Sequence, residues 1–195
     1  LLARGPGRHV AGGPTARRPG AALLLTYPHH GRLFAPLTVR SSGLRHHTGQ
    51  VSLPGGRLDR PDESAEEAAL REAREEIGVS ESSVDILGRL TPLPIAISGH
   101  LLIPVVGAAA SRPAFSLASS EVDRLIEAPI ERLLRRHEVG WEERIRSLPP
   151  GGLMQVPYFE LEGARVWGAT AMVLSEFIAL LEGLDLERAA GVIAP

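Results

Sequence analysis

Residues 54–79 decide the fold of this chain, and they read PGGRLDRPDESAEEAALREAREEIGV. Their second half predicts a helix from Ser64 to about Ile77. Ser64 is a favourable N-cap residue, and Glu67 three positions later completes the pattern of a capping box. Gly78 follows where a helix commonly ends. The expected buried stripe recurs every four residues, with one apolar neighbour beside it: Ala65, Ala69, Ala73 and Ile77, with Leu70.

Three carboxylates share the polar face of this helix. Glu72, Glu75 and Glu76 stand at positions i, i+3 and i+4, where like charges repel by about 0.2–0.5 kcal/mol per pair. Taken alone they fit a solvated helix face, with Arg71 and Arg74 as partners. The preceding Pro-Gly-Gly segment predicts a sharp turn whose backbone can approach another group closely. Carboxylates beside exposed carbonyls suit Mg²⁺ or Mn²⁺, so the stretch predicts a divalent metal site.

The stretch resembles the Nudix box, the loop–helix signature of hydrolases that split nucleoside diphosphates linked to another moiety. Gly55-Gly56-Arg57, Glu63 and Arg71 through Val79 carry the resemblance. The helical half matches throughout, whereas the segment from Gly56 to Arg71 is one residue longer than the commonest spacing. Either Asp62 or Glu63 fills the acidic position of the loop. The resemblance implies an α/β chain with the Nudix fold, an α/β/α sandwich with a mixed β-sheet.

A second pattern precedes the box over residues 37–56, which read LTVRSSGLRHHTGQVSLPGG. It resembles the extra motif of the coenzyme A pyrophosphatase branch of Nudix hydrolases, and the longer box spacing is also similar to that branch. Further short motifs extend the resemblance over roughly residues 21–182. These motifs are Ser98-Gly99, Pro104 to Gly107, Glu121-Val122 and Trp167 to Ala171.

The resemblance implies metal-dependent hydrolysis of coenzyme A and its derivatives to 3′,5′-ADP and 4′-phosphopantetheine or its acyl form. An alternative is a Nudix hydrolase of another nucleoside diphosphate derivative, such as ADP-ribose or NADH. A third reading is a non-catalytic Nudix-fold protein that senses a nucleotide. Such a sensor is expected to lose carboxylates of the box, and all three are present here.

The expected site residues fall into three groups. The metal ligands for Mg²⁺ or Mn²⁺ are Glu72, Glu75, Glu76 and the Gly55 carbonyl. The catalytic group comprises Arg71, which orients the glutamates by pairing with Glu75, and Glu72 or Glu121 as the carboxylate that accepts a proton from water.

The third group is the substrate-binding residues. Coenzyme A carries a 3′-phosphate besides its diphosphate, and guanidinium groups bind phosphate in bidentate fashion. His46 or His47 adds a donor that depends on protonation. The expected substrate-binding residues are Arg40, Ser41, Arg45, His47 and Gly49.

Composition narrows the class of protein. The chain has 195 residues, of which 44% are hydrophobic and 23% charged, with a formal net charge of −2. These values predict one soluble globular domain without a basic surface for nucleic acid. The absence of cysteine excludes disulfides, a thiol nucleophile and Cys-ligated metals. No apolar run reaches the ~18 residues that a membrane span needs. We expect a cytoplasmic protein that binds a small molecule and neither nucleic acid nor membrane. A homodimer is possible.

The remaining expectations concern chain organisation. We expect a flexible or partly helical arm over residues 1–20, one Nudix domain over 21–183 and a tail over 184–195. Expected strands are Ala21–Tyr27, Leu33–Arg40 (an edge or bulged strand because of Pro36), Val51–Leu53, Val84–Ile97, Leu101–Val106 and a hairpin of Gln155–Leu161 with Ala164–Trp167. Expected helices are Ile130–Arg136 and Ala169–Leu181. The run Glu131–Glu143 is expected to be a solvated helix followed by the segment that leaves it, and Trp167 is expected to pack in the core.

Overall fold

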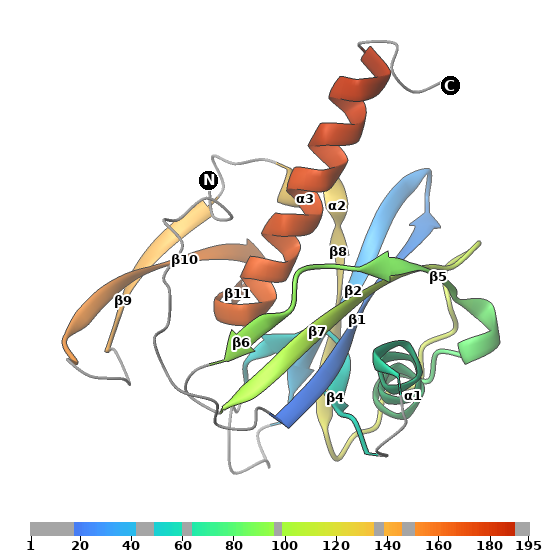
Figure 1. The fold of residues 1–195 in the computed structure, drawn as a ribbon, viewed down its shortest axis with the longest axis horizontal. Helices are drawn as coiled ribbons and strands as arrows, with labels where there is room; N and C mark the ends of the chain where they lie inside the picture. The colour runs from blue at the N-terminus through green and yellow to red at the C-terminus, as the bar shows by residue number, and fades with distance from the viewer. Residues whose placement is uncertain are drawn as a thin grey trace.

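The computed structural model describes residues 18–41, 49–59, 64–95, 99–134, 139–145 and 151–189. Two sheets and two longer helices make up the described part of the chain (Figure 1). In chain order the elements are β1 (Arg18–His29), β2 (Arg32–Arg40), β3 (Val51–Ser52), β4 (Gly55–Arg57), α1 (Ala65–Ile77), the 3₁₀ turn η1 (Glu81–Ser83), β5 (Asp85–Arg89), β6 (Leu93–Ile95), β7 (His100–Ala108), β8 (Val122–Pro129), α2 (Ile130–Leu133), β9 (Val139–Ile145), β10 (Leu153–Leu161), β11 (Ala164–Val166) and α3 (Gly168–Ala189).

The larger sheet is mixed and has the strand order β3-β2-β1-β7-β5. Strand β1 lies parallel to β7 and antiparallel to β2 and β4. Strands β6 and β8 pair with β7 and β2, and a separate three-stranded sheet has the order β11-β10-β9. The expected α/β architecture with a mixed sheet between helices is confirmed.

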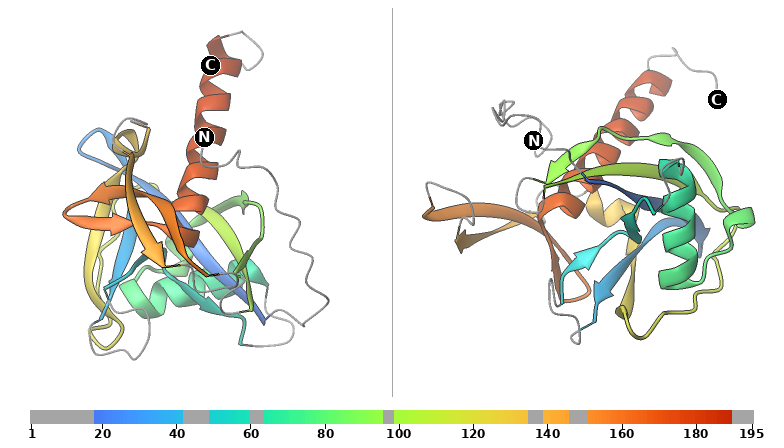
Figure 2. Two further views of the ribbon diagram at one scale, coloured as in Figure 1. Left: turned by 90° about the vertical axis from the view of Figure 1, so that its left-hand side faces the viewer. Right: turned by 60° about the horizontal axis from the view of Figure 1, so that its bottom comes forward.

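Strand β1 is buried on both faces, so its side chains divide between two hydrophobic clusters. On one face Ala21, Leu23, Leu25 and Tyr27 pack with α1. On the other face, Ala22 and Leu24 join a cluster that includes the first half of α3. The two helices therefore cover opposite faces of the sheet (Figure 2).

Helix α1 forms as expected from its local signals. The Ser64 side chain accepts a hydrogen bond from the Glu67 backbone N–H, and the Glu67 side chain accepts one from the Ser64 backbone, so the capping box is complete. Gly78 ends the helix with φ 73°, in the left-handed region. The buried face is rich in alanine, which lets the helix lie close to β1: Ala65, Ala68, Ala69, Ala73 and Ile77.

The expected turn at Gly55-Gly56 is wrong, because both residues belong to strand β4 and pair with β1. A Cβ on Gly55 would lie 2.4 Å from the Ala21 carbonyl oxygen. Gly55 is therefore required by its close packing against β1, whereas Gly56 leaves room for a side chain of α1. The bend falls one residue earlier, at Pro54.

Of the two alternatives expected from Pro36, the edge strand is wrong, and the bulge in the pairing of β2 lies at Val39/Arg40 instead of at Pro36. Strand β2 pairs with β8 on one side and with β1 and β3 on the other. The β1 ladder ends at Phe34 and the β3 ladder begins at Thr38. Pro36 lies between these two ladders and interrupts neither, which explains why it is tolerated.

The chain after residue 120 differs most from expectation. Strand β8 was not expected, and β9 occupies the second half of the segment expected to be a helix and its exit. Helix α2 ends at Leu133, whereas α3 continues to Ala189, well beyond Leu181. Trp167 is half-buried and lies under the Arg144 guanidinium, which is 3.7 Å from the ring centre, instead of being enclosed in the core.

Candidate functional site

Glu72 and Glu76 are the two box carboxylates that point toward strand β4. Glu76 is only 5% exposed, and its carboxylate accepts a hydrogen bond from the Gly55 backbone N–H. Glu72 lies against Gly56, where an added Cβ would come within 2.3 Å of the Glu72 Oε1 atom. The Gly-Gly pair thus makes room for one carboxylate and donates to the other.

Burial raises the pKa of the Glu76 carboxyl to about 7, and the nearby Glu72 and Glu121 carboxylates contribute to that rise. The Arg40 guanidinium and the Gly55 N–H oppose it. Burial also raises the pKa of Glu72, against the effect of its hydrogen bond from Arg71. Burial therefore acts on both carboxyls, and other carboxylates nearby add to the rise in pKa.

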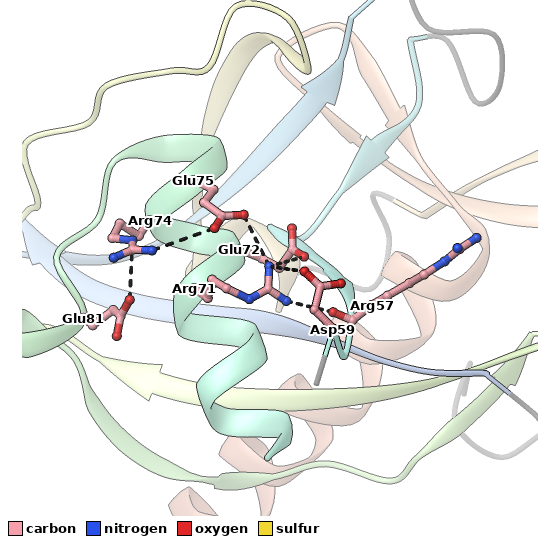
Figure 3. Close-up of polar contacts among 7 residues, drawn as sticks. All are labelled: Arg57, Asp59, Arg71, Glu72, Arg74, Glu75 and Glu81. Atoms are coloured by element: carbon pink, nitrogen blue, oxygen red, sulfur yellow. Dashed lines mark hydrogen bonds and ion pairs between the residues drawn. The ribbon is translucent and has the colours of Figure 1, made fainter. Parts of the chain in front are cut away.

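Arg71 is the centre of a polar cluster on the solvent side of α1 (Figure 3). Its Nη1 donates to Glu72 Oε1 at 2.8 Å and to Glu75 Oε2 at 3.3 Å. Its Nη2 donates to the Arg57 carbonyl oxygen at 2.9 Å, and Asp59 lies 3.6 Å away. The expected pairing of Arg71 with Glu75 is therefore present, and the same guanidinium joins the helix to β4.

Glu75 lies apart from the other two box carboxylates. Its side chain is 52% exposed and also lies 3.8 Å from Arg74. Within the described ranges, no three His, Cys, Asp or Glu side chains already form a group that could hold a metal ion. The structure thus brings Glu72 and Glu76 together and leaves Glu75 facing solvent, so its role as a ligand stays a prediction.

Arg40 lies at the end of β2, on the sheet side of the site. Its backbone N–H donates to the Gln50 carbonyl at 3.0 Å, and its own carbonyl accepts from Gly49 at 3.1 Å. Its Nε atom is buried and has no hydrogen-bond partner among the described residues. Two of the expected substrate-binding residues, Arg40 and Gly49, are therefore joined by their backbones beside Glu76.

A β-bulge lies next to Arg40. Val39 is opposite Arg124 in strand β8, whereas Arg40 is opposite Val122, so Asp123 has no counterpart in β2. Bulges re-aim the strand at functional sites. Next to this bulge, just after Arg40 and just before Val122, the Ser41 N–H donates to the Glu121 carbonyl at 2.9 Å. This hydrogen bond places Ser41 and Glu121 side by side.

The loop before Glu121 contributes contacts that sequence reasoning missed. The Ala118 N–H donates to the Glu76 carbonyl at 2.9 Å, and the Ser116 N–H donates to the Ile77 carbonyl at 3.0 Å. These residues act through their backbones, so their side-chain types carry no signal of the role. The expected site residues Arg45 and His47, and the alternatives Asp62 and Glu63, lie outside the described residues.

The residues present fit a divalent cation. The Glu76 Oε2 atom is buried and has no hydrogen-bond partner within the described part of the chain. An unpaired buried carboxylate oxygen is costly unless a cation or donor meets it. The donor set of carboxylate and carbonyl oxygens is the type that Mg²⁺ and Mn²⁺ prefer.

The site is thus an acidic helix packed on a mixed sheet, with Glu72 and Glu76 against a Gly-Gly strand, and the class of protein with this arrangement follows from its relatives. The NUDIX domain family matches residues 16–144. The chain is 41% identical over 166 residues to the uncharacterized Nudix hydrolase NudL of Pectobacterium atrosepticum, covering 84% of this chain and 83% of that protein. It is 36% identical over 157 residues to the protein of the same name from Yersinia enterocolitica, covering 75% and 78%.

Among solved structures, the fold is similar to the Nudix hydrolase RenU of M. Smegmatis. The TM-score is 0.51 at 25% identity, over 60% of this chain and 73% of that one. The chain therefore belongs to the Nudix hydrolase family, whose members act on nucleoside diphosphate derivatives. No helix in the described segments is long and apolar enough to cross a membrane.

Proposed function

We propose that this chain hydrolyses the diphosphate bond of coenzyme A and its derivatives, releasing 3′,5′-ADP and 4′-phosphopantetheine or its acyl form. The observation that supports the hydrolytic part is the buried Glu76 carboxylate. It lies near Glu72, Glu121 and Arg40, and one of its oxygens has no hydrogen-bond partner among the described residues. The coenzyme A part rests on the motif over residues 37–56 and on the longer spacing of the box.

The proposed metal ligands are Glu72, Glu76 and the Gly55 carbonyl, with Glu75 as a further ligand from the solvent side. A bound Mg²⁺ or Mn²⁺ supplies charge that polarises the diphosphate and lowers the pKa of a water molecule. The chain's own residues position these groups. Arg71 holds Glu72 by its 2.8 Å hydrogen bond and connects it to the Arg57 carbonyl.

Proton transfer needs a carboxylate that is close to the metal ligands without being enclosed. Glu121 is exposed at the mouth of the site, and its charge acts on Glu76. Glu72 is the other proposed acceptor, although its contacts with Gly56 and Arg71 restrict it more. Either carboxylate would remove a proton from the attacking water.

The substrate's phosphates would be bound by the cationic side of the site. Arg40 has a buried Nε donor with no partner among the described residues, and phosphate oxygens are strong acceptors for guanidinium. Ser41 and Gly49 adjoin Arg40 through the backbone. Arg45 and His47 complete the proposed set and are assigned to the 3′-phosphate end of the substrate.

The proposal is tested by incubating the purified chain with Mg²⁺ or Mn²⁺ and, separately, coenzyme A, acetyl-coenzyme A, ADP-ribose and NADH. Chromatography then identifies the products. We expect 3′,5′-ADP from both coenzyme A substrates, and slower hydrolysis of the other two. Preferential cleavage of ADP-ribose or NADH would overturn the substrate assignment, and inertness toward all four would overturn the proposed function.

A further inference from the structure

The β9–β10 hairpin projects from the body of the protein (Figures 1 and 2) and carries an exposed apolar face. Trp141 is 62% exposed, Ile145 79% and Leu153 69%. In the register of the hairpin, Ile145 is opposite Leu153 and Trp141 is opposite Pro157, so these side chains share one face. Exposed apolar patches of this kind commonly mark interaction surfaces.

The apolar face continues from the hydrophobic core. Val139 and Phe159, the next pair along the same face, pack in the cluster beneath α3. The hairpin is therefore an extension of a core layer beyond the body of the domain. The burial that protects Phe159 ends before Trp141, and nothing in the described part of the chain covers the outer pairs.

The opposite face of the hairpin already has partners. Arg144 lies 3.7 Å from the Trp167 ring centre, and Arg165 lies 4.7 Å from that of Tyr158. Glu142 pairs with both arginines, with Arg165 at 2.7 Å. This ladder of guanidinium, carboxylate and aromatic groups fixes the hairpin to the start of α3, so the apolar face keeps a defined direction.

The outer edge of the hairpin is free to pair with another strand. Within the described residues β9 pairs with β10 alone, so its other edge presents unpaired backbone groups. An antiparallel copy of β9, related by a two-fold axis through Glu143, is complementary to it. Trp141 then lies opposite Ile145 of the partner subunit, and Glu142 lies opposite Arg144 of the partner subunit.

The alternative two-fold registers make fewer complementary pairs, and an axis through Trp141 leaves Ile145 beyond the end of the partner's β9. Side chains alternate between the two faces of a strand. A two-fold axis perpendicular to the sheet therefore places the apolar faces of both copies on the same side only when the axis passes through a residue, not between two residues. An axis through Glu142 or Arg144 places each of these charges opposite its own copy within the ladder face, where like charges repel. An axis through Glu143 also sets one carboxylate, on the apolar face, opposite its copy. That carboxylate is exposed and accepts from Gln155 at 3.2 Å, and this register alone pairs Glu142 with Arg144 and Trp141 with Ile145.

We propose that β9 forms a homodimer interface, in which a second copy of this chain adds its β9 antiparallel across a two-fold axis at Glu143. The two three-stranded sheets then become one continuous sheet. On one side Trp141 and Ile145 of the two subunits pack on either side of the paired Glu143 residues, and on the other side the alternating charges of Glu142 and Arg144 meet. The interface lies outside the site described above and is independent of the proposed activity.

The first test measures the mass of the full chain by light scattering over a range of concentrations. We expect the mass to rise with concentration from 20.8 kDa toward twice that value. Trp141→Glu should remain monomeric at every concentration. Leu87→Glu is the matched control, because Leu87 is 65% exposed on β5, away from the hairpin. This variant should dimerise as the wild type does. A monomeric wild type, or a dimer that persists in Trp141→Glu, would overturn the proposal.

The second test uses the absence of cysteine from the chain. Directly opposed residues in an antiparallel pair have Cα atoms about 4.5–5.5 Å apart, which is within the range of disulfides. Glu143→Cys should therefore give a covalent dimer under mild oxidation. Gln155→Cys, opposite Glu143 on β10, lies one strand further from the axis in each subunit and should stay monomeric. Equal cross-linking of both variants, or of neither, would contradict the register and with it the interface.

Discussion

The backbone N–H of Ala118 donates a 2.9 Å hydrogen bond to the backbone carbonyl of Glu76. The carbonyls at the end of a helix have no partner within the helix, so the loop satisfies one of them and is held against α1. Glu121 follows three residues later, and its N–H donates to the Ala118 carbonyl at 2.9 Å. Ala118 therefore links the backbone of Glu76 to that of Glu121.

Glu76→Gln should reduce turnover by about 100-fold or more. The amide keeps an oxygen for the Gly55 N–H but loses the charge that holds a metal, and metal stabilisation of transferring phosphate contributes several kcal/mol. Without metal, the variant should melt at a higher temperature, because it removes the charge of a buried carboxylate of which one oxygen has no hydrogen-bond partner among the described residues. Steady-state kinetics and thermal melts check both expectations.

The control for this variant is Glu81→Gln. Glu81 is 44% exposed and pairs with Arg74 at 3.4 Å beyond the end of α1. Its loss should change neither turnover nor melting temperature appreciably. Wild-type turnover in Glu76→Gln would show that the metal is held elsewhere.

Gly56→Ala should lower kcat while preserving the fold. The added methyl group would lie 2.3 Å from Glu72 Oε1, so the carboxylate must move away from its hydrogen bond with Arg71. Gly183→Ala is the matched control, since no atom lies within 4 Å of its added Cβ. Alanine in a helix interior should stabilise that variant by about 0.5–1 kcal/mol. Equal kcat values in the two variants would exclude a positioned role for Glu72.

Removing metal with EDTA should abolish activity, and Mg²⁺ or Mn²⁺ should restore it. A ligand at about 100 times its Kd stabilises the native state by about 2.7 kcal/mol, which for a chain of this size raises the melting temperature by about 5–10 °C. The double variant Glu72→Gln/Glu76→Gln should lose this shift. If millimolar Mn²⁺ raised both melting temperatures equally, the cation would bind outside the box.

Arg45→Ala should discriminate between substrates. If Arg45 binds the 3′-phosphate, its loss should weaken the binding of coenzyme A by ~1.5–3 kcal/mol, the range for hydrogen bonds to charged groups. Dephospho-coenzyme A lacks that phosphate, so its KM should stay nearly constant. Arg32→Ala, at the far end of β2 and paired with Glu131, controls for loss of positive charge. Equal losses with both substrates would assign Arg45 to the diphosphate instead.

Glu127→Gln should destabilise the protein at neutral pH by about 1–2 kcal/mol, a modest value because its partner Arg112 is partly exposed. The hydrogen bonds from Arg112, and then that from the Tyr27 hydroxyl at 2.6 Å, hold the pKa of Glu127 below its ordinary value. Because the pKa of Glu127 is lower in the folded state, its ionised form stabilises the protein. This stabilisation is fully present above the pKa of about 4.3 in the unfolded state, and it is lost as the pH falls through the pKa of the folded state.

The difference in unfolding free energy between wild type and Glu127→Gln should therefore be constant from pH 7 to about pH 5 and shrink below about pH 4. Urea unfolding at several pH values measures it. A difference that persists unchanged at pH 3 would show that Gln disturbs packing around Tyr27 instead of removing a charge.

The box helix was predictable because local signals decide it. Its cap, its apolar stripe and Gly78 act within a few residues, and the structure confirms each of them. The Gly55-Gly56 pair was not, since glycine suits both a turn and a closely packed strand. Contacts with Ala21 and Ala22, more than 30 positions away in the sequence, decide for the strand.

The site was predictable in its residue types and less so in its geometry. Spacing alone puts Glu72, Glu75 and Glu76 on one helix face, but it does not show that β4 buries Glu76 while Glu75 faces solvent. The position of Arg40 depends on a bulge opposite β8, a strand that the sequence did not indicate. Long-range pairing of this kind leaves no short-range pattern to read.

Strand β1 separates the two hydrophobic clusters and supplies side chains to both. Neither cluster can come apart without exposing one face of β1 to water, so the two should melt together as a single cooperative unit. Helix α1 should therefore not unfold locally at a small cost in free energy. Hydrogen exchange at its central amides should require global unfolding, and the acidic residues of the site keep their places for as long as the domain is folded.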